Sequence, residues 1–183
     1  MLYTRKGDGG TTKTFGCDQR ISKSSAIAEA LGSLDEINSF LGLCKVKSAE
    51  KNFAIDGKKI TDIVHDIQQT LFIIQAQVAG AEKKVPEKKV IAAEALIDAV
   101  EKLLPPIKTF FISGGTELAA TFDVARTIAR RAERRVVAVS EEGTRKIDPE
   151  TFRYLNRLSS ILYALARLSN HLAGVTEEAP KYQ

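Results

Sequence analysis

The sequence is poor in the residues that build metal centres and disulfide scaffolds. Its 183 residues include two cysteines, two histidines and no tryptophan. Cys17 and Cys44 lack CxxC spacing, and His65 and His171 do not form an HExxH motif, so we expect no metal held by protein ligands. No apolar run reaches the about 18 residues that a membrane span needs, and the first residues lack the apolar segment of a signal peptide. We therefore expect a cytoplasmic protein with free thiols that does not enter a membrane.

The excess positive charge lies in one short segment. The chain has 27 basic and 23 acidic residues. Residues 126–135 contain five arginines and one glutamate, which leaves 22 basic and 22 acidic residues elsewhere. A protein that binds nucleic acid over a broad surface would spread its basic residues more widely, so we expect no nucleic-acid partner. One basic stripe on a balanced chain instead favours a compact anionic ligand or a salt-bridged subunit interface.

Helical periodicity dominates the chain from residue 24 onward. Apolar residues recur at spacings of three and four, and Gly or Pro residues separate the periodic segments. Asp148 followed by Pro149 is typical of a helix start. The pattern predicts one all-α domain over residues 1–183, with an irregular arm at 1–23 and an up-down five-helix bundle with left-handed, coiled-coil-like packing at 24–174. The predicted apolar stripes cover residues 27–44, 60–78, 90–104, 118–139 and 155–172.

The arm has the composition of a phosphate-binding loop. Residues 4–13 contain three glycines, three threonines and three basic side chains. Glycines let backbone N–H groups converge on an anion, and basic side chains neutralise it. The segment is neither a Walker A loop nor a dinucleotide-binding fingerprint. A flexible polar N-terminus remains the alternative.

Polar residues within the predicted helices offer further candidates. Arg126, Arg130 and Glu133 share one helix face, which either binds an anion or is a solvated arginine face. Asp35 is an expected partner for one of these arginines, or an exposed acid. Asn156 could point inward and contact a nucleobase or ribose, or form a hydrogen bond within the bundle.

Five segments of this chain occur together, in the same order, in one known family. Between about Tyr3 and Ala173 the chain resembles the ATP:cob(I)alamin adenosyltransferases of the type that includes the propanediol-utilisation enzyme and the human mitochondrial enzyme. The resemblance implies a transferase that moves the 5′-deoxyadenosyl group of ATP to the cobalt of cob(I)alamin and releases triphosphate. It also implies a homotrimer with active sites at subunit interfaces. The segments are Thr4-x-x-Gly7-Asp8-x-Gly10-x-Thr12, Leu34-Asp35-Glu36-Ile37-Asn38-Ser39, Ser113-Gly114-Gly115-Thr116, Arg130-Arg131-Ala132-Glu133-Arg134 and Leu155-Asn156-Arg157-Leu158-Ser159.

The same resemblance assigns roles to individual residues. Arg126 would pair with Asp35 near the interface, and Arg130 would act on the triphosphate. Phe110 would lie under the corrin and displace the lower axial ligand of cobalt. These four are the expected catalytic residues, and Mg²⁺ is expected to accompany ATP. The residues implied in ATP binding are Thr4, Arg5, Lys6, Gly7, Thr12, Lys13, Lys23, Arg130, Glu133, Arg134 and Asn156.

The chain departs from the family pattern at three positions, one of which is Gly9 in the arm, where relatives often have Lys. Ser113 stands where the family often has Pro, in the loop that carries Phe110, and Ser160 stands where it often has Asp. Two other functions remain open at this stage. One is a regulatory bundle that binds ATP without turnover, and the other is a helical scaffold or RNA-binding protein. If the chain is the transferase, its product could pass to an adenosylcobalamin-dependent enzyme.

Overall fold

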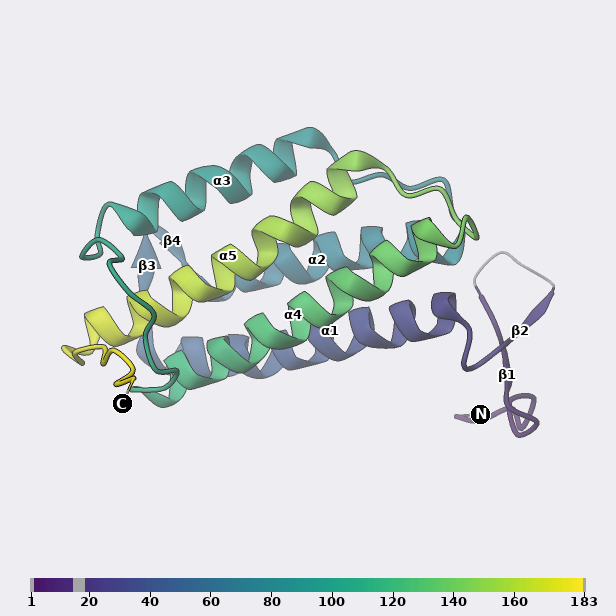
Figure 1. Cartoon of the computed structure of the whole chain (residues 1–183), viewed down its shortest axis with the longest axis horizontal. Coiled ribbons are helices and arrows are strands. Elements are labelled where there is room, and N and C mark those ends of the chain that lie inside the picture. The colour runs from purple at the N-terminus through teal and green to yellow at the C-terminus, as the bar shows by residue number, and fades with distance from the viewer. Residues whose placement is uncertain (1, 15–18, 183) are drawn as a thin grey trace.

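The computed structural model describes residues 2–14 and 19–182, and five helices account for most of them. Successive helices run in opposite directions along one long axis (Figure 1). This confirms the predicted all-α, up-down, five-helix bundle, while the handedness of its packing stays a prediction. The helices are α1 (Ala26–Lys51), α2 (Ile60–Ala79), α3 (Glu87–Glu101), α4 (Glu117–Glu141) and α5 (Pro149–Leu172).

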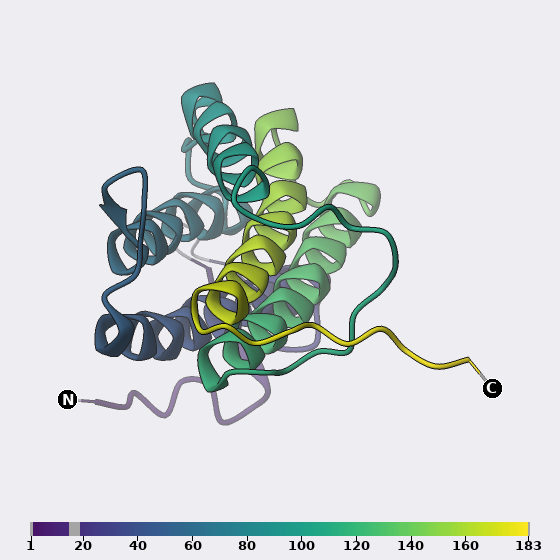
Figure 2. The same ribbon diagram turned by 90° about the vertical axis from the view of Figure 1, so that its left-hand side faces the viewer.

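The order of the helices across the bundle differs from their order in the chain. α1 packs against α2 and α4, and α5 packs against α4 and α3. The connection from α3 to α4, residues 102–116, therefore has to pass α5 before it reaches α4 (Figure 2). The segment after α5 turns towards this connection (Figure 2). The topology thus brings a long loop and the C-terminal segment to one end of the α4–α5 pair.

The predicted apolar stripes form the core. Leu34, Leu71, Phe122 and Leu162 are completely buried between the helices. Each such side chain contributes about 1.5–3 kcal/mol of hydrophobic stabilisation relative to exposure. α4 also buries four alanines, and these small side chains let the neighbouring helices approach α4 closely. No helix in the described part of the chain is both long and apolar enough to cross a membrane.

Most helix ends lie close to their predicted positions, but the hydrogen bonds at these ends are not all the expected ones. Thr116 caps α4, and its Oγ1 accepts a hydrogen bond from the Ala119 N–H at 3.1 Å. Asp148 is the N-cap residue of α5 as predicted, but its carboxylate accepts a hydrogen bond from Gln77 Nε2 at 2.6 Å. α3 ends at Glu101, one turn before the predicted end of its stripe. The two prolines at 105 and 106 therefore lie in the loop and do not themselves end the helix.

The arm, predicted as irregular, also contains a short hairpin. Strands β1 (Thr11–Lys13) and β2 (Arg20–Ser22) pair antiparallel, and β3 (Ala54–Ile55) and β4 (Lys58–Lys59) form a second small hairpin between α1 and α2. Strands of two or three residues are too short for alternation of apolar residues to reveal them. The arm extends beyond the N-terminal end of α1 and away from the bundle (Figure 1). Cys17 lies outside the described residues.

Candidate functional site

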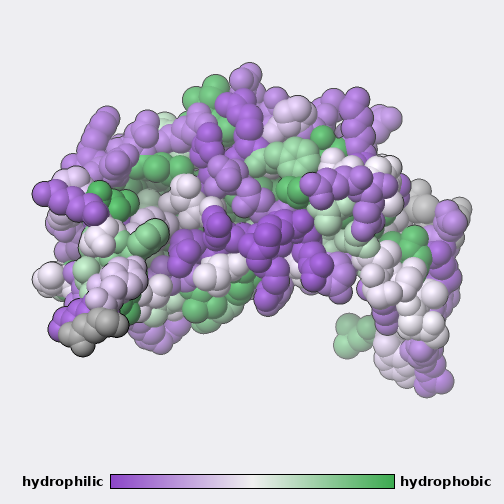
Figure 3. Space-filling model, in the orientation of Figure 1, coloured by the Kyte–Doolittle hydropathy of each residue, from purple (hydrophilic) through white to green (hydrophobic). Residues whose placement is uncertain are grey.

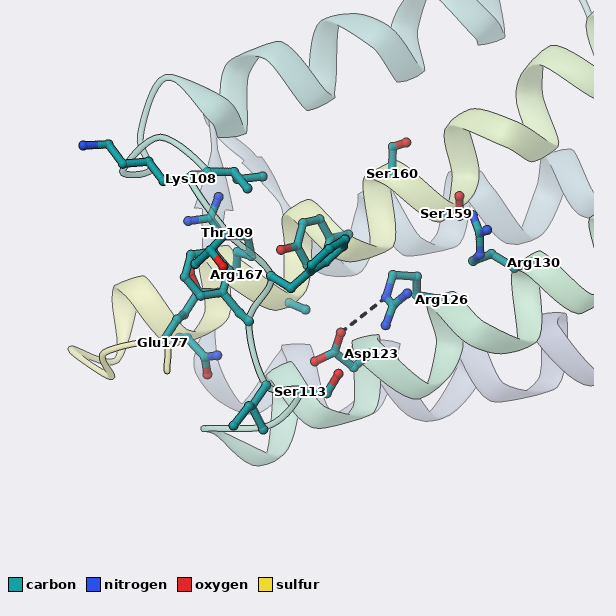
Figure 4. A pocket seen from close by; sticks show the side chains of 17 residues that line it. Lys108, Thr109, Ser113, Asp123, Arg126, Arg130, Ser159, Ser160, Arg167 and Glu177 are labelled. Atoms are coloured by element: carbon teal, nitrogen blue, oxygen red, sulfur yellow. Dashed lines mark hydrogen bonds and ion pairs between the residues drawn. The ribbon is translucent and has the colours of Figure 1, made fainter. Parts of the chain in front are cut away.

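A pocket of about 600 Å³ lies between α4, α5, the loop before α4 and the C-terminal segment. Three of the four expected catalytic residues, Phe110, Arg126 and Arg130, line it. They come from a loop and from two successive turns of α4. Figure 4 shows the loop residues Thr109 and Ser113 at one end of this pocket and Arg130 at the other. The structure therefore brings these three candidates together at one pocket, and their roles stay predictions.

Arg126 is held by groups from its own chain. Its Nε donates a hydrogen bond to Oδ1 of Asp123 at 3.4 Å, and its guanidinium lies 5.8 Å from the centre of the Tyr163 ring. Desolvation raises the pKa of Tyr163, so its ring is a neutral phenol at physiological pH. Asp35 is exposed on α1 and does not line the pocket. Within one chain the acidic partner of Arg126 is thus Asp123 and not Asp35, because Asp123 lies one turn away on the same helix.

The two phenylalanines of the loop have different environments. Phe110 is 78% exposed, although it lines the pocket. Phe111 is half-buried, and its ring centre lies 5.0 Å from the guanidinium of Arg167. The side chain that is free to contact a ligand is therefore that of Phe110, which agrees with the expected register of the loop.

A buried asparagine on α5, which sequence reasoning missed, fixes the end of this loop. Asn170 Oδ1 accepts a hydrogen bond from the Thr116 N–H at 2.9 Å, and Asn170 Nδ2 donates to the Gly114 carbonyl at 2.9 Å. Gly114 and Gly115 have φ angles of 126° and 95°, which L side chains rarely adopt. A Cβ atom on Gly115 would lie 2.4 Å from Asn170 Oδ1. Glycine is therefore needed here for both its backbone conformation and the space it leaves.

The exposed surface of α4 and α5 carries the remaining helical candidates. Asn156 is exposed, and of its two predicted contacts it forms the hydrogen bond within the bundle. Its Nδ2 donates to Glu133 Oε1 at 3.1 Å and links α5 to α4. Among the described residues, no acidic side chain forms an ion pair with the exposed Arg130 and Arg134. Figure 3 shows hydrophilic side chains in a band over α4 and α5, which is a suitable surface for an anion.

Arg20, which sequence reasoning also missed, organises the arm. Its Nε donates to Thr11 Oγ1 at 2.8 Å, and its Nη2 donates to the carbonyls of Thr11 and Lys6. The Lys23 N–H donates to the Gly10 carbonyl at 2.9 Å. A Cβ atom on Gly7 would lie 3.1 Å from Lys23 Nζ, so these two candidates are neighbours. Arg20 could have been found from its position between the two basic candidates Lys13 and Lys23.

The arm candidates are close to one another but separate from the α4–α5 candidates. Thr4, Arg5 and Lys6 are exposed, and Thr12 and Lys13 pair with Ile21 and Arg20 in the hairpin. The hairpin extends away from the helices (Figure 1). In one chain, therefore, the two expected halves of the ATP site do not meet.

The described residues contain no cluster of three or more histidine, cysteine or acidic side chains that could hold a metal ion. Cys44 is a free, buried thiol. Desolvation raises its pKa to about 12, so the thiolate that would bind a metal or attack a substrate is not formed near neutral pH. Within the described part of the chain, the chemistry of the site thus rests on arginines, backbone groups and one exposed aromatic ring.

Comparisons with known proteins point to one family. The family model for cobalamin adenosyltransferase matches residues 2–169. The corrinoid adenosyltransferase PduO of Citrobacter freundii is 42% identical over 177 residues, and the match covers 93% of this chain and 50% of that protein. The chain thus spans about half the length of this relative. The corrinoid adenosyltransferase of Bacillus subtilis is 36% identical over 175 residues, with 95% of this chain and 89% of that protein covered.

Solved structures show the same fold. A variant of the PduO-type ATP:corrinoid adenosyltransferase of Lactobacillus reuteri, complexed with cobalamin and ATP, superposes with a TM-score of 0.87. It is 30% identical in sequence, and the match covers 99% of this chain and 97% of that chain. From the match of the family model over most of its length, together with these relatives, we conclude that the chain belongs to the cobalamin adenosyltransferase family.

Proposed function

We propose that this protein transfers the 5′-deoxyadenosyl group of ATP to the cobalt of cob(I)alamin. One observation carries the proposal: Phe110 from the loop and Arg126 and Arg130 from α4 line one pocket in a member of this family. Arg130 would stabilise the triphosphate, Arg126 would lie near the corrin, and Phe110 would lie on the lower face of the corrin and displace the lower ligand of cobalt. The Lactobacillus reuteri relative was solved with both cobalamin and ATP, which supports the same two substrates here.

The chemistry needs no nucleophilic side chain, because Co(I) of the corrin substrate supplies the electron pair. It attacks C5′ of ATP, a Co–C bond forms, and the C5′–O5′ bond breaks with its electrons going to the triphosphate. The cobalt is thereby oxidised from Co(I) to Co(III). Negative charge develops on the leaving oxygen, and cationic donors fixed in place before the reaction stabilise it best. We assign this role to Arg130, which has no acidic partner among the described residues.

ATP would bind between the arm and the α4–α5 surface. The proposed arm residues are Thr4, Arg5, Lys6, Gly7, Thr12, Lys13 and Lys23, and the proposed helical residues are Arg130, Glu133, Arg134 and Asn156. Glycine-rich backbone and basic side chains suit a triphosphate. Glu133 is the one acid among the proposed residues, and Mg²⁺ would bind mainly through phosphate oxygens, where it neutralises part of their charge.

We further propose that the site forms between copies of the chain in a homotrimer. The separation of the arm from α4 supports this, because an arm that extends beyond its own bundle can reach α4 of a neighbouring copy. In the same arrangement the exposed Asp35 would face Arg126 of a neighbour. We also propose a cytoplasmic location, consistent with ATP as substrate and with the free Cys44 thiol.

The first test is direct. The protein is incubated with ATP, cobalamin and a reductant, and the corrin absorbance is followed. We expect conversion to adenosylcobalamin and release of one triphosphate per product. Saturable ATP binding without any corrin change would instead support a regulatory nucleotide-binding bundle.

A second test examines whether the site is shared between chains. A Lys6→Ala chain, defective in the arm, and an Arg130→Ala chain, defective in α4, are co-expressed in equal amounts. If each site takes its arm from one chain and α4 from the next, about a quarter of the sites in randomly mixed trimers are intact. The mixture should then regain about a quarter of the wild-type rate. A mixture as inactive as its components would show that each site lies within one chain.

A further inference from the structure

Arg167 is a buried charge in the wall of the pocket that takes no part in the proposed reaction itself. It lies on α5, and its side chain is 5% exposed. Its Nε donates to Oε2 of Glu177 at 2.8 Å, and that carboxylate is itself 17% exposed. Removing a guanidinium from water costs several kcal/mol unless partners compensate it. The groups that compensate the charge of Arg167 therefore show which segments of the chain this residue joins.

These partners belong to two segments that are distant in the sequence. Glu177 is in the C-terminal segment, whereas Pro105 and Phe111 are in the loop that carries Phe110. Arg167 Nη2 donates to the Pro105 carbonyl at 3.1 Å, and the guanidinium lies 5.0 Å from the centre of the Phe111 ring. A cation over an aromatic face is attracted to it, and more strongly when water is excluded. One side chain thus contacts both ends of the 105–111 segment and the C-terminal segment.

The two segments are also joined directly. The Ile112 N–H donates to the Glu178 carbonyl at 2.8 Å. Figure 4 shows Arg167, Thr109 and Glu177 together at the end of the pocket opposite Arg130. The Ile112 bond lies two residues after Phe110, and the Pro105 contact lies five residues before it. The backbone on both sides of Phe110 is therefore held, although the Phe110 ring itself is exposed.

We propose that Arg167 and Glu177 are positioning residues that hold Phe110 in place for the cobalt of the corrin substrate. The proposal rests on the proposed function, in which Phe110 lies on the lower face of the corrin. With the Arg167–Glu177 pair intact, the loop is already ordered before the corrin binds. Without it, the loop has to be ordered at the time of binding, and the entropy cost lowers the fraction of bound corrin that loses its lower ligand. The C-terminal segment is then a functional part of the site.

The test uses Glu177→Ala, Glu177→Gln and the control Glu178→Ala. Glu178 is adjacent and contacts the loop through its carbonyl, which alanine retains. In the protein without ligands, Glu177→Ala should speed amide hydrogen exchange of residues 107–113 by about tenfold or more. Glu177→Gln should have a smaller effect, because its amide oxygen can still accept from Arg167. Glu178→Ala should exchange like the wild type.

The second measurement is spectroscopic. Cob(II)alamin is added with saturating ATP, and the fraction that has lost its lower nitrogen ligand is read from absorbance and electron paramagnetic resonance. Glu177→Ala should reduce this fraction severalfold and leave the Kd for ATP unchanged, since the loop is not proposed to contact nucleotide.

The outcomes separate this inference from the proposed function. Wild-type exchange in Glu177→Ala would overturn the inference, whatever the enzyme does. Faster exchange with an unchanged lower-ligand fraction would also overturn it, because Phe110 would then not depend on the pair. A wild-type protein that binds no cobalamin would instead overturn the proposed function. The exchange result would then still show whether the Arg167–Glu177 pair orders residues 107–113.

Discussion

Arg126 Nε lies 3.4 Å from Oδ1 of Asp123, one turn earlier on α4. The other carboxylate oxygen, Oδ2, accepts a hydrogen bond from the Gly114 N–H at 3.3 Å. Asp123 therefore connects Arg126 to the loop that carries Phe110. If Asp35 of a neighbouring copy approaches Arg126, it joins or replaces an ion pair that already exists. The net gain from that second carboxylate is then smaller than for an unpaired arginine.

The first prediction concerns Asp35, the carboxylate proposed to approach Arg126 from a neighbouring copy. We expect Asp35→Asn to weaken corrin binding or turnover by about tenfold, because the proposed charge pair with Arg126 of a neighbouring copy would lose one member. The measurement is a titration with corrin at saturating ATP, with the oligomer mass determined on the same samples. Asp62→Asn is the control, since Asp62 is also an exposed acid on a helix. Equal and small effects of the two variants would leave Asp35 as an ordinary surface residue.

The second prediction concerns Arg130. Arg130→Ala should lower kcat by about 10²–10³, as expected for loss of one donor to a developing negative charge. Helical content and the free energy of unfolding should remain close to wild type, because this side chain is exposed and has no ion pair among the described residues. Arg153→Ala, which removes an arginine whose ion pair with Glu87 measures 3.7 Å, is the matched control. A wild-type rate and ATP affinity in Arg130→Ala would remove this residue from the site.

The third prediction concerns the arm. ATP should slow amide hydrogen exchange in residues 4–13 by at least about tenfold, because its phosphates would fix exposed Gly- and Thr-rich backbone. Residues 54–59 are the internal control, since β3 and β4 also form a small, largely exposed hairpin but lie outside the proposed site. Exchange in 4–13 that stays unchanged at saturating ATP would contradict the proposed role of the arm.

The helices were predictable because burial of one face imposes a spacing of three and four on apolar residues over many turns. Phe122 and Leu155, for example, belong to predicted stripes and are completely buried. The site was predictable only where its chemistry is visible in the sequence, as in the arginines of 126–135. The Arg126–Asp123 pair was also accessible, because both residues lie on one helix three positions apart.

Arg167 and Asn170 were missed for a physical reason. In the sequence each is a polar residue within or beside an apolar stripe, and such residues usually point to solvent. Arg167 and Asn170 are buried because residues 105–116 and Glu177 pack against them. The position of those residues depends on the path of the chain from α3 past α5 to α4. Sequence periodicity describes one helix at a time and contains no information on that path. The partners of buried polar groups therefore had to come from the structure.

The fourth prediction follows from the pKa of Cys44, which burial raises to about 12. An unfolded thiol ionises near pH 8.5. The folded state keeps the Cys44 thiol neutral. The contribution of this buried thiol to the free energy of unfolding is therefore complete below pH 8.5 and is lost as pH rises from there towards 12. We expect the stability advantage of the wild type over Cys44→Ala to fall by up to about 1.4 kcal/mol per pH unit above pH 9. Urea unfolding of both proteins at pH 7, 9 and 10 measures it, and a constant difference would show that Cys44 ionises freely in the folded protein.

The last prediction concerns Phe110 and compares it with its neighbour. Phe110→Ala should bind ATP normally but lose at least about tenfold in rate with cob(II)alamin and a reductant, because the lower ligand could then stay on cobalt and keep Co(II) hard to reduce. Supplying cob(I)alamin bypasses this reduction, so the defect should become smaller. The exposed ring of Phe110 contributes little to stability, and the variant should unfold at nearly the wild-type urea concentration.

Phe111→Ala is the matched control, because the same ring is removed one position later. Phe111 packs against Arg167, so its loss should cost on the order of 2 kcal/mol of unfolding free energy through lost packing and cation–π attraction. Phe110→Leu should retain more of the rate than Phe110→Ala, since a smaller apolar wall survives. If Phe111→Ala gave the reduction defect and Phe110→Ala the loss of stability, the loop would bind corrin with its register shifted by one residue. If neither variant affected reduction, the lower face of the corrin would have to be formed elsewhere, and Ser113, where the family often has proline, would be the first position to change.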